Sequence, residues 1–166
     1  MIDKFFEVID KILRWILYRD FNITISEEKL QAFIEFVKFG VIGLSNTVIS
    51  YMLYLLSLFT FQSLKILPST DYLVAQIIGF VLSVLWSFYW NNRFVFKDEG
   101  KKRNLLQALI KTYISYAFTG LFLNSVLSVL WVEVLHWSKM IAPIVNLLVS
   151  VPINFLLNKF WAFKNK

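Results

Sequence analysis

Four long apolar segments constrain this chain more than any other feature. A helix needs about 20 mostly apolar residues to cross the hydrocarbon core of a bilayer, and four segments meet that requirement, at about residues 39–61, 72–92, 109–132 and 140–158. Apolar residues make up 58% of the 166 residues, more than a soluble domain of this size could bury. The sequence therefore predicts an all-α, polytopic membrane protein with four transmembrane helices.

The positive charges predict how these helices are oriented. Of the 17 Lys and Arg residues, 15 lie before the first segment, between the second and third or at the start of the third (Lys111), or after the fourth. Lys and Arg accumulate in cytoplasmic loops, so both termini are expected in the cytoplasm of a multi-pass plasma-membrane protein. The net charge of +6 is then a signal of topology that also attracts anionic membrane lipids, and no nucleic-acid partner is expected.

The N-terminal region has the pattern of an amphipathic helix. Apolar side chains of residues 2–18 fall on one helical face and charged side chains on the other. Such a helix lies on the cytoplasmic membrane surface, either as a simple anchor or as a docking face for a partner enzyme. Ser26 followed by Glu27 and Glu28 predicts the start of a second helix. We therefore divide the chain into an arm, residues 1–32, and a transmembrane domain, residues 33–166.

The ends of the second and fourth segments resemble each other. Residues 88–97 align with residues 155–164 at an offset of 67, which also pairs Asn91 with Asn158 and Ser83 with Ser150. Residues spaced by four share one helix face, so both segments carry a polar stripe. Each half of the chain begins and ends on the same side. The expected architecture is therefore two transmembrane hairpins related as a parallel repeat, plus the interfacial N-terminal helix.

Uncharged amides gather inside the predicted spans. An amide facing lipid is costly, so these side chains should face a neighbouring helix or a water-filled cavity. Ser83 and Ser150 are better explained as packing residues between helices. Pro152 removes a backbone donor inside the fourth span and predicts a kink there, and broken helices often line sites in transporters. The candidate interior set is Asn46, Gln76, Asn91, Asn124, Asn146, Asn154 and Asn158.

Four basic residues mark the predicted cytoplasmic ends of the spans. They are Lys38, Arg93, Lys111 and Lys159. Cations at this depth would suit an anionic headgroup such as a phosphate, and the amides above them would suit the hydroxyls of a sugar. Simple snorkelling of long basic side chains to the membrane surface explains the same pattern.

The sequence excludes several kinds of chemistry, because the residues that they require are absent. The chain has no Cys and one His, which excludes disulfides, thiol catalysis and multi-histidine metal sites. No Asp or Glu lies at mid-depth, where a proton-coupled pump would carry one. Glu133 and His136 are better explained as a surface pair than as catalytic residues. There is no phosphate-binding loop or nucleophile–base pattern, so we expect no enzyme, no metal and no cofactor.

Several of these residues form patterns of a known family. Residues 36–47, with the sequence FVKFGVIGLSNT, resemble the start of the GtrA-like family, and so do residues 91–96, NNRFVF, and the ending Phe163-Lys164. The similarity covers about residues 33–166, so the arm lies outside the usual core. The positions that match the motifs are Gly40, Gly43, Asn46, Asn91 and Arg93.

The resemblance implies a role in the synthesis of cell-surface polysaccharide. Members are thought to move polyprenyl-phosphate-linked sugars from the cytoplasmic to the outer leaflet. They commonly act with a membrane glycosyltransferase that makes the lipid-linked sugar. The glycans that the resemblance implies are O-antigen, teichoic acid and arabinogalactan.

Two other functions fit the same pattern. One is a non-transporting subunit that anchors or stabilises a glycosyltransferase. The amphipathic arm is the feature that suggests this function. The other is a small multidrug-type exporter, although such a role is opposed by the absence of a mid-membrane Glu. Four helices enclose little space for a bulky headgroup, so a homodimer or a complex with the transferase is a plausible arrangement.

Overall fold

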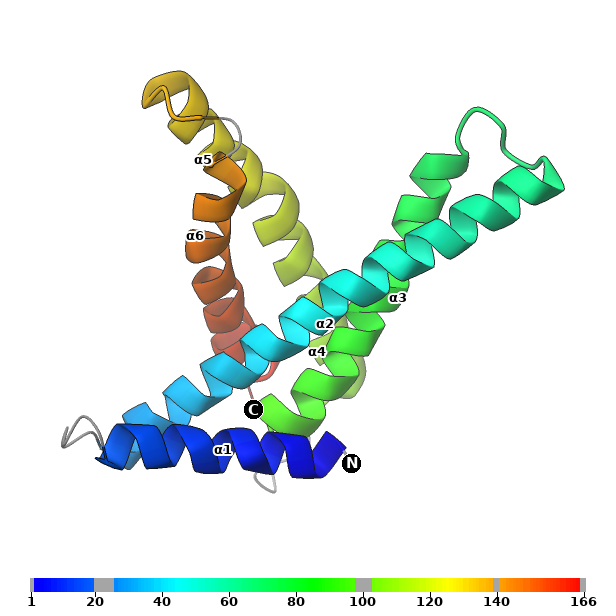
Figure 1. Ribbon diagram of the computed structural model, residues 1–166. Coiled ribbons are helices and arrows are strands. Elements are labelled where there is room, and N and C mark those ends of the chain that lie inside the picture. Colours follow the sequence, from blue (N-terminus) through cyan, green and yellow to red (C-terminus); the bar gives the residue numbers. More distant parts are fainter. Residues whose placement is uncertain (1, 20–25, 98–102, 139–140, 165–166) are drawn as a thin grey trace.

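The computed structural model describes residues 2–19, 26–97, 103–138 and 141–164, and their regular structure is helical throughout (Figure 1). Four helices are long and apolar enough to cross a membrane, which confirms the four predicted spans. The predicted start of the fourth span, Met140, lies outside the described residues. In chain order the elements are α1 (Ile2–Arg19), α2 (Glu27–Leu64), α3 (Asp71–Trp90), η1 (Asn91–Val95), α4 (Leu105–Ala117), η2 (Phe118–Leu123), α5 (Asn124–Val129), η3 (Leu130–Val134), α6 (Ala142–Leu157) and η4 (Asn158–Ala162).

The elements named η are π-helical turns that continue a neighbouring α-helix. η1 extends α3, and η4 extends α6, whereas η2, α5 and η3 prolong α4. The four candidate spans are therefore Glu27–Leu64, Asp71–Val95, Leu105–Val134 and Ile144–Ala162. Turns of this kind are uncommon and often lie at functional sites.

Helix α2 begins where the sequence predicts a helix start. Ser26 is its N-cap residue with an extended backbone, and Glu27 and Glu28 occupy the first turn. The helix runs for 38 residues, or about 57 Å, and ends at Lys65 in the left-handed conformation. Because this length exceeds a hydrocarbon core of about 30 Å, the first turns of α2 extend beyond the apolar segment. The boundary drawn at residue 32 falls inside this helix.

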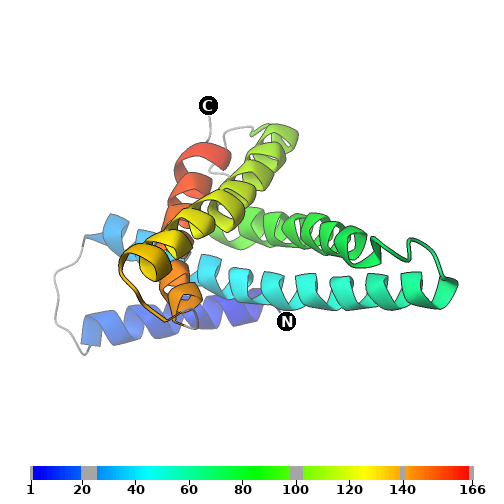
Figure 2. The same cartoon turned by 90° about the horizontal axis from the view of Figure 1, so that it is seen from above.

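The helices form two pairs that diverge from one end of the molecule. α2 lies beside α3, and the helix formed by α4, η2, α5 and η3 lies beside α6 (Figures 1 and 2). Helix α1 and both termini lie at the end where the pairs meet (Figure 1). We call this the α1 end, and we call the opposite end, with the connections after α2 and before α6, the loop end.

An aromatic cluster joins the two pairs at the α1 end. The ring of Phe96 stacks on that of Phe163 with centroids 4.6 Å apart, and Phe39 meets Phe155 edge-on at 5.5 Å. These side chains are buried, together with Phe94. Aromatic pairs of this geometry contribute about 0.5–1.5 kcal/mol each beyond their buried area. The cluster therefore holds α2, η1 and the end of α6 together.

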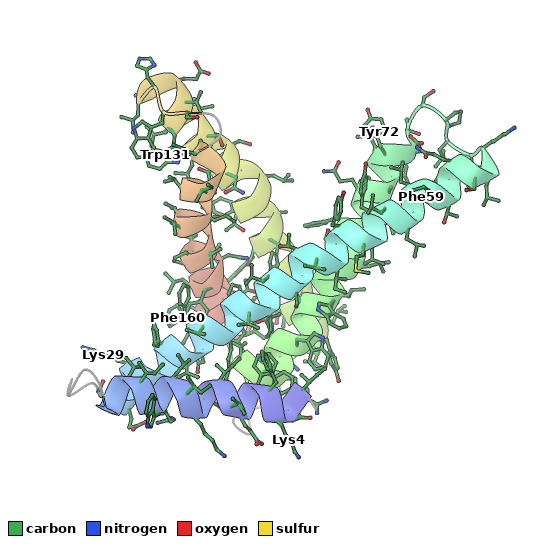
Figure 3. All side chains as sticks on the ribbon, viewed as in Figure 1. Lys4, Lys29, Phe59, Tyr72, Trp131 and Phe160 are labelled. Atoms are coloured by element: carbon green, nitrogen blue, oxygen red, sulfur yellow. The ribbon has the colours of Figure 1, made fainter. Side chains whose placement is uncertain are left out.

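Helix α1 is docked on this end by one of its faces. The buried ring of Phe6 stacks on Phe94 with centroids 4.3 Å apart. Lys4, on the far side of α1, points away from the bundle (Figure 3). A further stripe of apolar side chains on α1 is exposed, and it consists of Ile2, Phe5, Val8, Ile12 and Trp15. The other described residues thus cover only part of the apolar surface of α1.

Gly79 allows α2 and α3 to approach closely. A Cβ atom at Gly79 would lie 2.8 Å from the Ser50 carbonyl oxygen, a backbone atom of α2. Small residues let helices pack closely in membranes. By contrast, a Cβ atom at Gly40 or Gly43 would have no atom within 4 Å, within the limits of the described residues. The two motif glycines thus face open space, whereas Gly79 makes the helix contact.

We expect Gly79→Ala to destabilise the protein by about 1–3 kcal/mol, because the added methyl group overpacks a contact with backbone. Gly43→Ala is the matched control and should leave stability unchanged. The measurement is the thermal unfolding midpoint of each purified variant in the same detergent. Equal midpoints for Gly79→Ala and Gly43→Ala would contradict the close α2–α3 contact.

Candidate functional site

Two adjoining cavities lie between the helix pairs. The first, of about 730 Å³, lies between α2, the helix of α4, η2 and α5, and α6. The second, of about 580 Å³, lies between α2, α3 and the region of Tyr116 and Gly120. We call them the apolar cavity and the tyrosine cavity. Asn46, Thr47, Tyr116 and Gly120 line both, so the cavities meet at these four residues.

The apolar cavity is lined mainly by hydrocarbon side chains. Phe36, Phe39 and Leu44 of α2 face Leu147 and Val151 of α6 across it. Gly40 and Gly43 also line it, and because they have no side chain they leave the α2 wall open. Its polar lining residues are Asn46, Thr47, Tyr116, Thr119, Asn124, Ser150 and Asn154. Such a cavity suits a hydrocarbon chain that carries a small number of polar groups.

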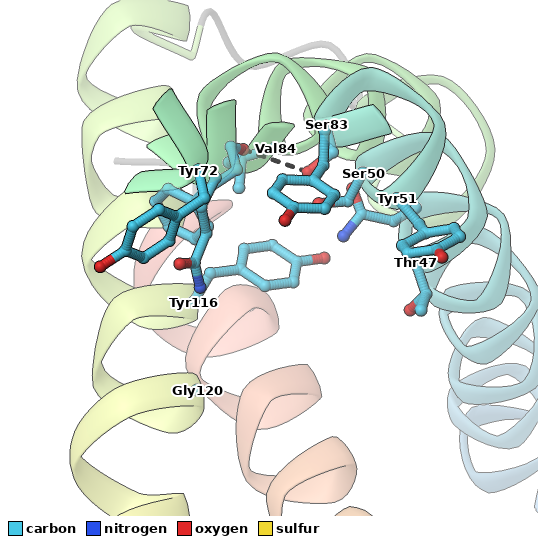
Figure 4. Close-up of a pocket in the computed structure, with 12 residues that line it drawn as sticks. Thr47, Ser50, Tyr51, Tyr72, Ser83, Val84, Tyr116 and Gly120 are labelled. Carbon is cyan, nitrogen blue, oxygen red and sulfur yellow. Dashed lines mark hydrogen bonds between the residues drawn. The ribbon is translucent and has the colours of Figure 1, made fainter. Parts of the chain in front are cut away.

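The tyrosine cavity has a different chemistry. Its lining includes the four tyrosines Tyr51, Tyr54, Tyr72 and Tyr116 (Figure 4). The hydroxyl of Tyr116 lies 2.7 Å from the Ser87 Oγ and joins α4 to α3. Further hydroxyl and amide groups come from Asn46, Thr47, Ser50, Gln76 and Ser83.

Asn46 and Asn124 have buried amide oxygens that are free to accept hydrogen bonds. Among the residues that the structure describes, neither Oδ1 atom has a hydrogen-bond partner. A buried polar atom without a partner costs about 1–3 kcal/mol, which a ligand hydroxyl or a water molecule would offset. Both residues line the apolar cavity, and Asn46 lines the tyrosine cavity as well. They are the strongest hydroxyl-binding candidates of the predicted set.

Asn91 and Asn158 instead hold two matching turns at the α1 end. Asn91 Nδ2 donates to Ser87 Oγ at 3.0 Å, and Asn158 Nδ2 donates to Asn154 Oδ1 at the same distance. The backbone N–H groups of Phe96 and Phe163 donate to the carbonyl oxygens of Asn91 and Asn158, at 2.8 Å in both turns. Both amides are buried, and their Oδ1 atoms also lack a hydrogen-bond partner among the described residues, but neither residue lines a cavity.

Asn146 is used in helix packing. Its Oδ1 accepts from Trp131 Nε1 at 2.9 Å, and its Nδ2 donates to Ser128 Oγ at 2.8 Å and to the Asn124 carbonyl oxygen at 3.2 Å. These bonds fix α6 against α5 and η3. The other predicted residues do line a cavity: Gln76 the tyrosine cavity, and Asn154 and Pro152 the apolar cavity. Helix α6 continues through Pro152 without interruption.

Each of the four candidate headgroup cations has a protein partner. Lys159 Nζ lies 2.7 Å from Glu35 Oε2, and Lys111 Nζ donates to the Trp161 carbonyl oxygen at 3.2 Å. Helix α1 supplies the partners of the other two. They are Asp10, with Oδ2 2.8 Å from Lys38 Nζ, and Asp3, with Oδ1 2.9 Å from Arg93 Nη2.

These cations lie at the edge of the cavities. Among the described residues that line either cavity there is no Lys or Arg. Lys38 nevertheless immediately precedes Phe39 and Gly40, which line the apolar cavity. Its side chain is only 6% exposed. A headgroup phosphate that reached Lys38 would therefore have to replace the Asp10 carboxylate.

Comparison with known proteins identifies the family of this chain. Residues 38–163 match the protein family described as "GtrA/DPMS, transmembrane domain". The chain belongs to the GtrA/DPMS family. It is therefore a multi-pass membrane protein of a family generally without catalytic activity.

One curated relative has a name that states a role in glycosylation. The chain is 23% identical over 112 residues to "Cell wall teichoic acid glycosylation protein GtcA" of Listeria monocytogenes. The alignment covers 68% of this chain and 77% of the relative. No solved structure matches the chain.

The GtrA/DPMS match separates the cavities from the arm. All lining residues of both cavities lie within residues 38–163 except Phe36. Helix α1 precedes the matched region. The acids that neutralise Lys38 and Arg93 therefore lie outside the residues that match the GtrA/DPMS domain.

Sequence reasoning missed most of the tyrosine cavity. Tyr51 and Tyr54 share a helix face with Thr47, because they follow it by four and seven residues. Tyrosine prefers the ends of transmembrane helices, yet Tyr51 lies 13 residues after Lys38 and 14 before Lys65. A tyrosine at mid-span was thus the signal that could have indicated this cavity.

Proposed function

We propose that the protein moves a polyprenyl-phosphate-linked sugar across the plasma membrane, for glycosylation of a cell-surface polymer such as teichoic acid. The observation that carries this proposal is the pair of cavities that meet at Asn46 and Tyr116. The distribution of basic residues assigns the α1 end to the cytoplasm and the loop end to the outer surface. The apolar cavity then serves the inner half of the membrane and the tyrosine cavity the outer half.

The length of this path supports translocation. On α2 the lining residues extend from Phe36 to Tyr54, which is 18 residue steps, or about 27 Å along the helix. The hydrocarbon core is about 30 Å thick. A simple membrane anchor has no need for polar groups at all these depths.

The chemistry of the path suits a neutral sugar on an apolar chain. Amides and hydroxyls such as Asn46, Thr119 and Asn124 would exchange hydrogen bonds with sugar hydroxyls, while Leu147 and Val151 would contact the prenyl chain. No Asp or Glu is among the described residues that line either cavity. Transport would therefore run downhill, driven by synthesis of the substrate inside and its use outside.

The cations at the α1 end would receive the phosphate. Lys38 and Arg93 carry carboxylate partners from α1, and a phosphate would exchange one anionic partner for another. Lys111 and Lys159 occupy the corresponding ends of the other half. Exchange of partners avoids leaving a buried cation unpaired at any step.

The architecture we infer follows the sequence expectations. Residues 33–166 would form two parallel hairpin repeats, in which the matching turns at Asn91 and Asn158 are equivalent. The arm, residues 1–32, would place α1 at the cytoplasmic interface. Its exposed apolar stripe would lie among lipid headgroups and upper acyl chains.

Translocation in proteoliposomes tests this function directly. Purified protein would be reconstituted with a polyprenyl-phosphate hexose, and an impermeant enzyme would measure the sugar exposed on the outside. We expect protein-dependent exposure of the inner pool. No exposure, when a known flippase is active in the same assay, would contradict the proposal.

The exposed stripe of α1 supports a second candidate, a subunit that anchors a membrane glycosyltransferase. Ile2, Phe5 and Val8 are exposed and form an apolar surface that the described residues leave uncovered. Under this function, deletion of residues 2–19 would abolish co-purification of the transferase, while proteoliposomes containing the full chain would show no translocation. Retained co-purification after the deletion would exclude α1 as the docking element.

A further inference from the structure

The tyrosine cavity contains several polar side chains that lack protein partners. Among the described residues, the side chains of Ser50, Tyr51, Tyr54, Tyr72 and Gln76 make no hydrogen bond. The buried Oδ1 of Asn46 adds an acceptor at the inner edge of the cavity. Tyr51 and Tyr72 are more than half exposed, so the cavity is open on one side. Polar groups at membrane depth need partners, and these groups are accessible to a molecule with many hydroxyl groups, or to water.

The position of the tyrosines separates them from ordinary interfacial anchors. Tyr51 lies about 20 Å from the helix positions of both Lys38 and Lys65, at 1.5 Å per residue. Tyr72 is the second residue of α3, at the loop end. Tyr51 and Tyr54 of α2 and Tyr72 of α3 thus extend from the middle of the membrane to its edge at the loop end, and Tyr116 of α4 completes the set.

Tyrosine combines the two properties that a sugar ring requires. Its aromatic face packs against C–H groups, and its hydroxyl donates and accepts hydrogen bonds. The rings of Tyr51 and Tyr54 are stacked with centroids 6.3 Å apart and an interplanar angle of 27°. Gln76 and Asn46 add amide donors and acceptors. Together these groups could contact both the apolar face and the hydroxyl rim of one ring.

The charge of the lining restricts the ligand further. No Lys, Arg, Asp or Glu is found among the described residues that line the tyrosine cavity. An anionic group would be desolvated there without a counter-ion. The cavity volume of about 580 Å³ lies within the range of ordinary small-molecule sites, about 300–1,000 Å³.

We propose that the tyrosine cavity is a binding site for a neutral hexose, which it holds in the half of the membrane near the loop end. This inference rests on the proposed function, because the hexose is the sugar of the translocated lipid. The described lining offers no cation to hold the phosphate, so this cavity binds the sugar and lets the phosphate pass. Asn46 and Tyr116, which line both cavities, pass the ring from the apolar cavity to the tyrosine cavity.

Binding of a sugar without lipid or phosphate tests the site separately from transport. The probes are the methyl glycosides of glucose, galactose and N-acetylglucosamine, added to the full-length protein in nanodiscs and detected by saturation-transfer NMR. We expect at least one of them to bind. Tyr51→Leu and Tyr54→Leu should each weaken its affinity about tenfold, which corresponds to about 1.4 kcal/mol.

Phe59→Leu is the matched control, since Phe59 is an exposed aromatic residue of α2 outside both cavities (Figure 3). It should bind the probe as the unmodified chain does. Tyr51→Phe and Tyr54→Phe keep the rings and test the hydroxyls alone, so they replace the leucine variants if those fail to fold. A smaller loss of affinity in the phenylalanine variants would support combined ring and hydroxyl contacts.

Two results would overturn the site. One is the absence of binding by every probe, and the other is unchanged affinity in both leucine variants. The proposed function is tested by the proteoliposome assay and can fail independently. Translocation without hexoside binding would overturn the tyrosine site alone, whereas tyrosine-dependent binding without translocation would support the site and contradict the flippase.

Discussion

Asn46→Leu should lower translocation about tenfold or more, without lowering the stability of the protein. The Asn46 Oδ1 is buried without a partner in the described structure and lies where both cavities meet. Leucine would leave passing sugar hydroxyls unpaired at this point, and each unpaired group costs about 1–3 kcal/mol. The free energy of unfolding should stay constant or rise, because an unsatisfied buried acceptor is removed.

Two further variants serve as controls for Asn46→Leu. Thr60→Leu alters a polar residue of the same helix that lines neither cavity and bonds only to the Leu56 carbonyl oxygen, so it should translocate normally. Asn146→Leu should instead destabilise the protein, because it leaves the Trp131 Nε1 donor without its acceptor. The measurements are initial translocation rates and thermal unfolding midpoints. An unchanged rate for Asn46→Leu would exclude Asn46 from the path.

Asp10→Lys should detach α1 from the bundle. It places a second ammonium group beside Lys38, whose present partner is the Asp10 carboxylate at 2.8 Å. Like charges brought together cost several kcal/mol, and solvent screens little here because the Lys38 side chain is only 6% exposed. The double variant Asp10→Lys/Lys38→Asp restores the pair in reverse and should restore docking.

Crosslinking can measure this docking cleanly. The chain has no cysteine, so cysteines introduced for Asp3 and Arg93, whose side chains meet at 2.9 Å, would react only with each other under a short thiol crosslinker. We expect a high yield in the Asp3→Cys/Arg93→Cys background, a yield near zero after Asp10→Lys, and recovery in the charge-reversed double variant. An undiminished yield after Asp10→Lys would contradict the role of the Asp10–Lys38 pair.

The sequence predicted the helices well, since each span must be long and apolar whatever its neighbours are. The four spans and the helix start at Ser26 depend on local composition and capping. Periodicity could also place the amides on common helix faces. It could not separate Asn46 and Asn124, which open to a cavity, from Asn146, which is bonded to a neighbouring helix.

The missing information concerned contacts between distant segments. Asp3 meets Arg93, and Glu35 meets Lys159, across 90 and 124 residues of sequence. Gly79 is needed because of a backbone oxygen of Ser50 on another helix. The resemblance to the GtrA family correctly indicated the membrane domain, but residues 38–163 exclude the helix that neutralises two of its cations.

The divergence of the helix pairs has a mechanical consequence. Phe39, Phe96, Phe155 and Phe163 join the pairs at the α1 end, while the loop ends of α2–α3 and α5–α6 lie apart (Figure 1). The two helix pairs can therefore rotate about this cluster, each as a rigid body. For a lever of about 30 Å, the length of a 20-residue helix, a rotation of about 10° displaces the far end by about 5 Å. Small rearrangements of the aromatic rings would thus change the spacing of the helix pairs more at the loop end than at the α1 end.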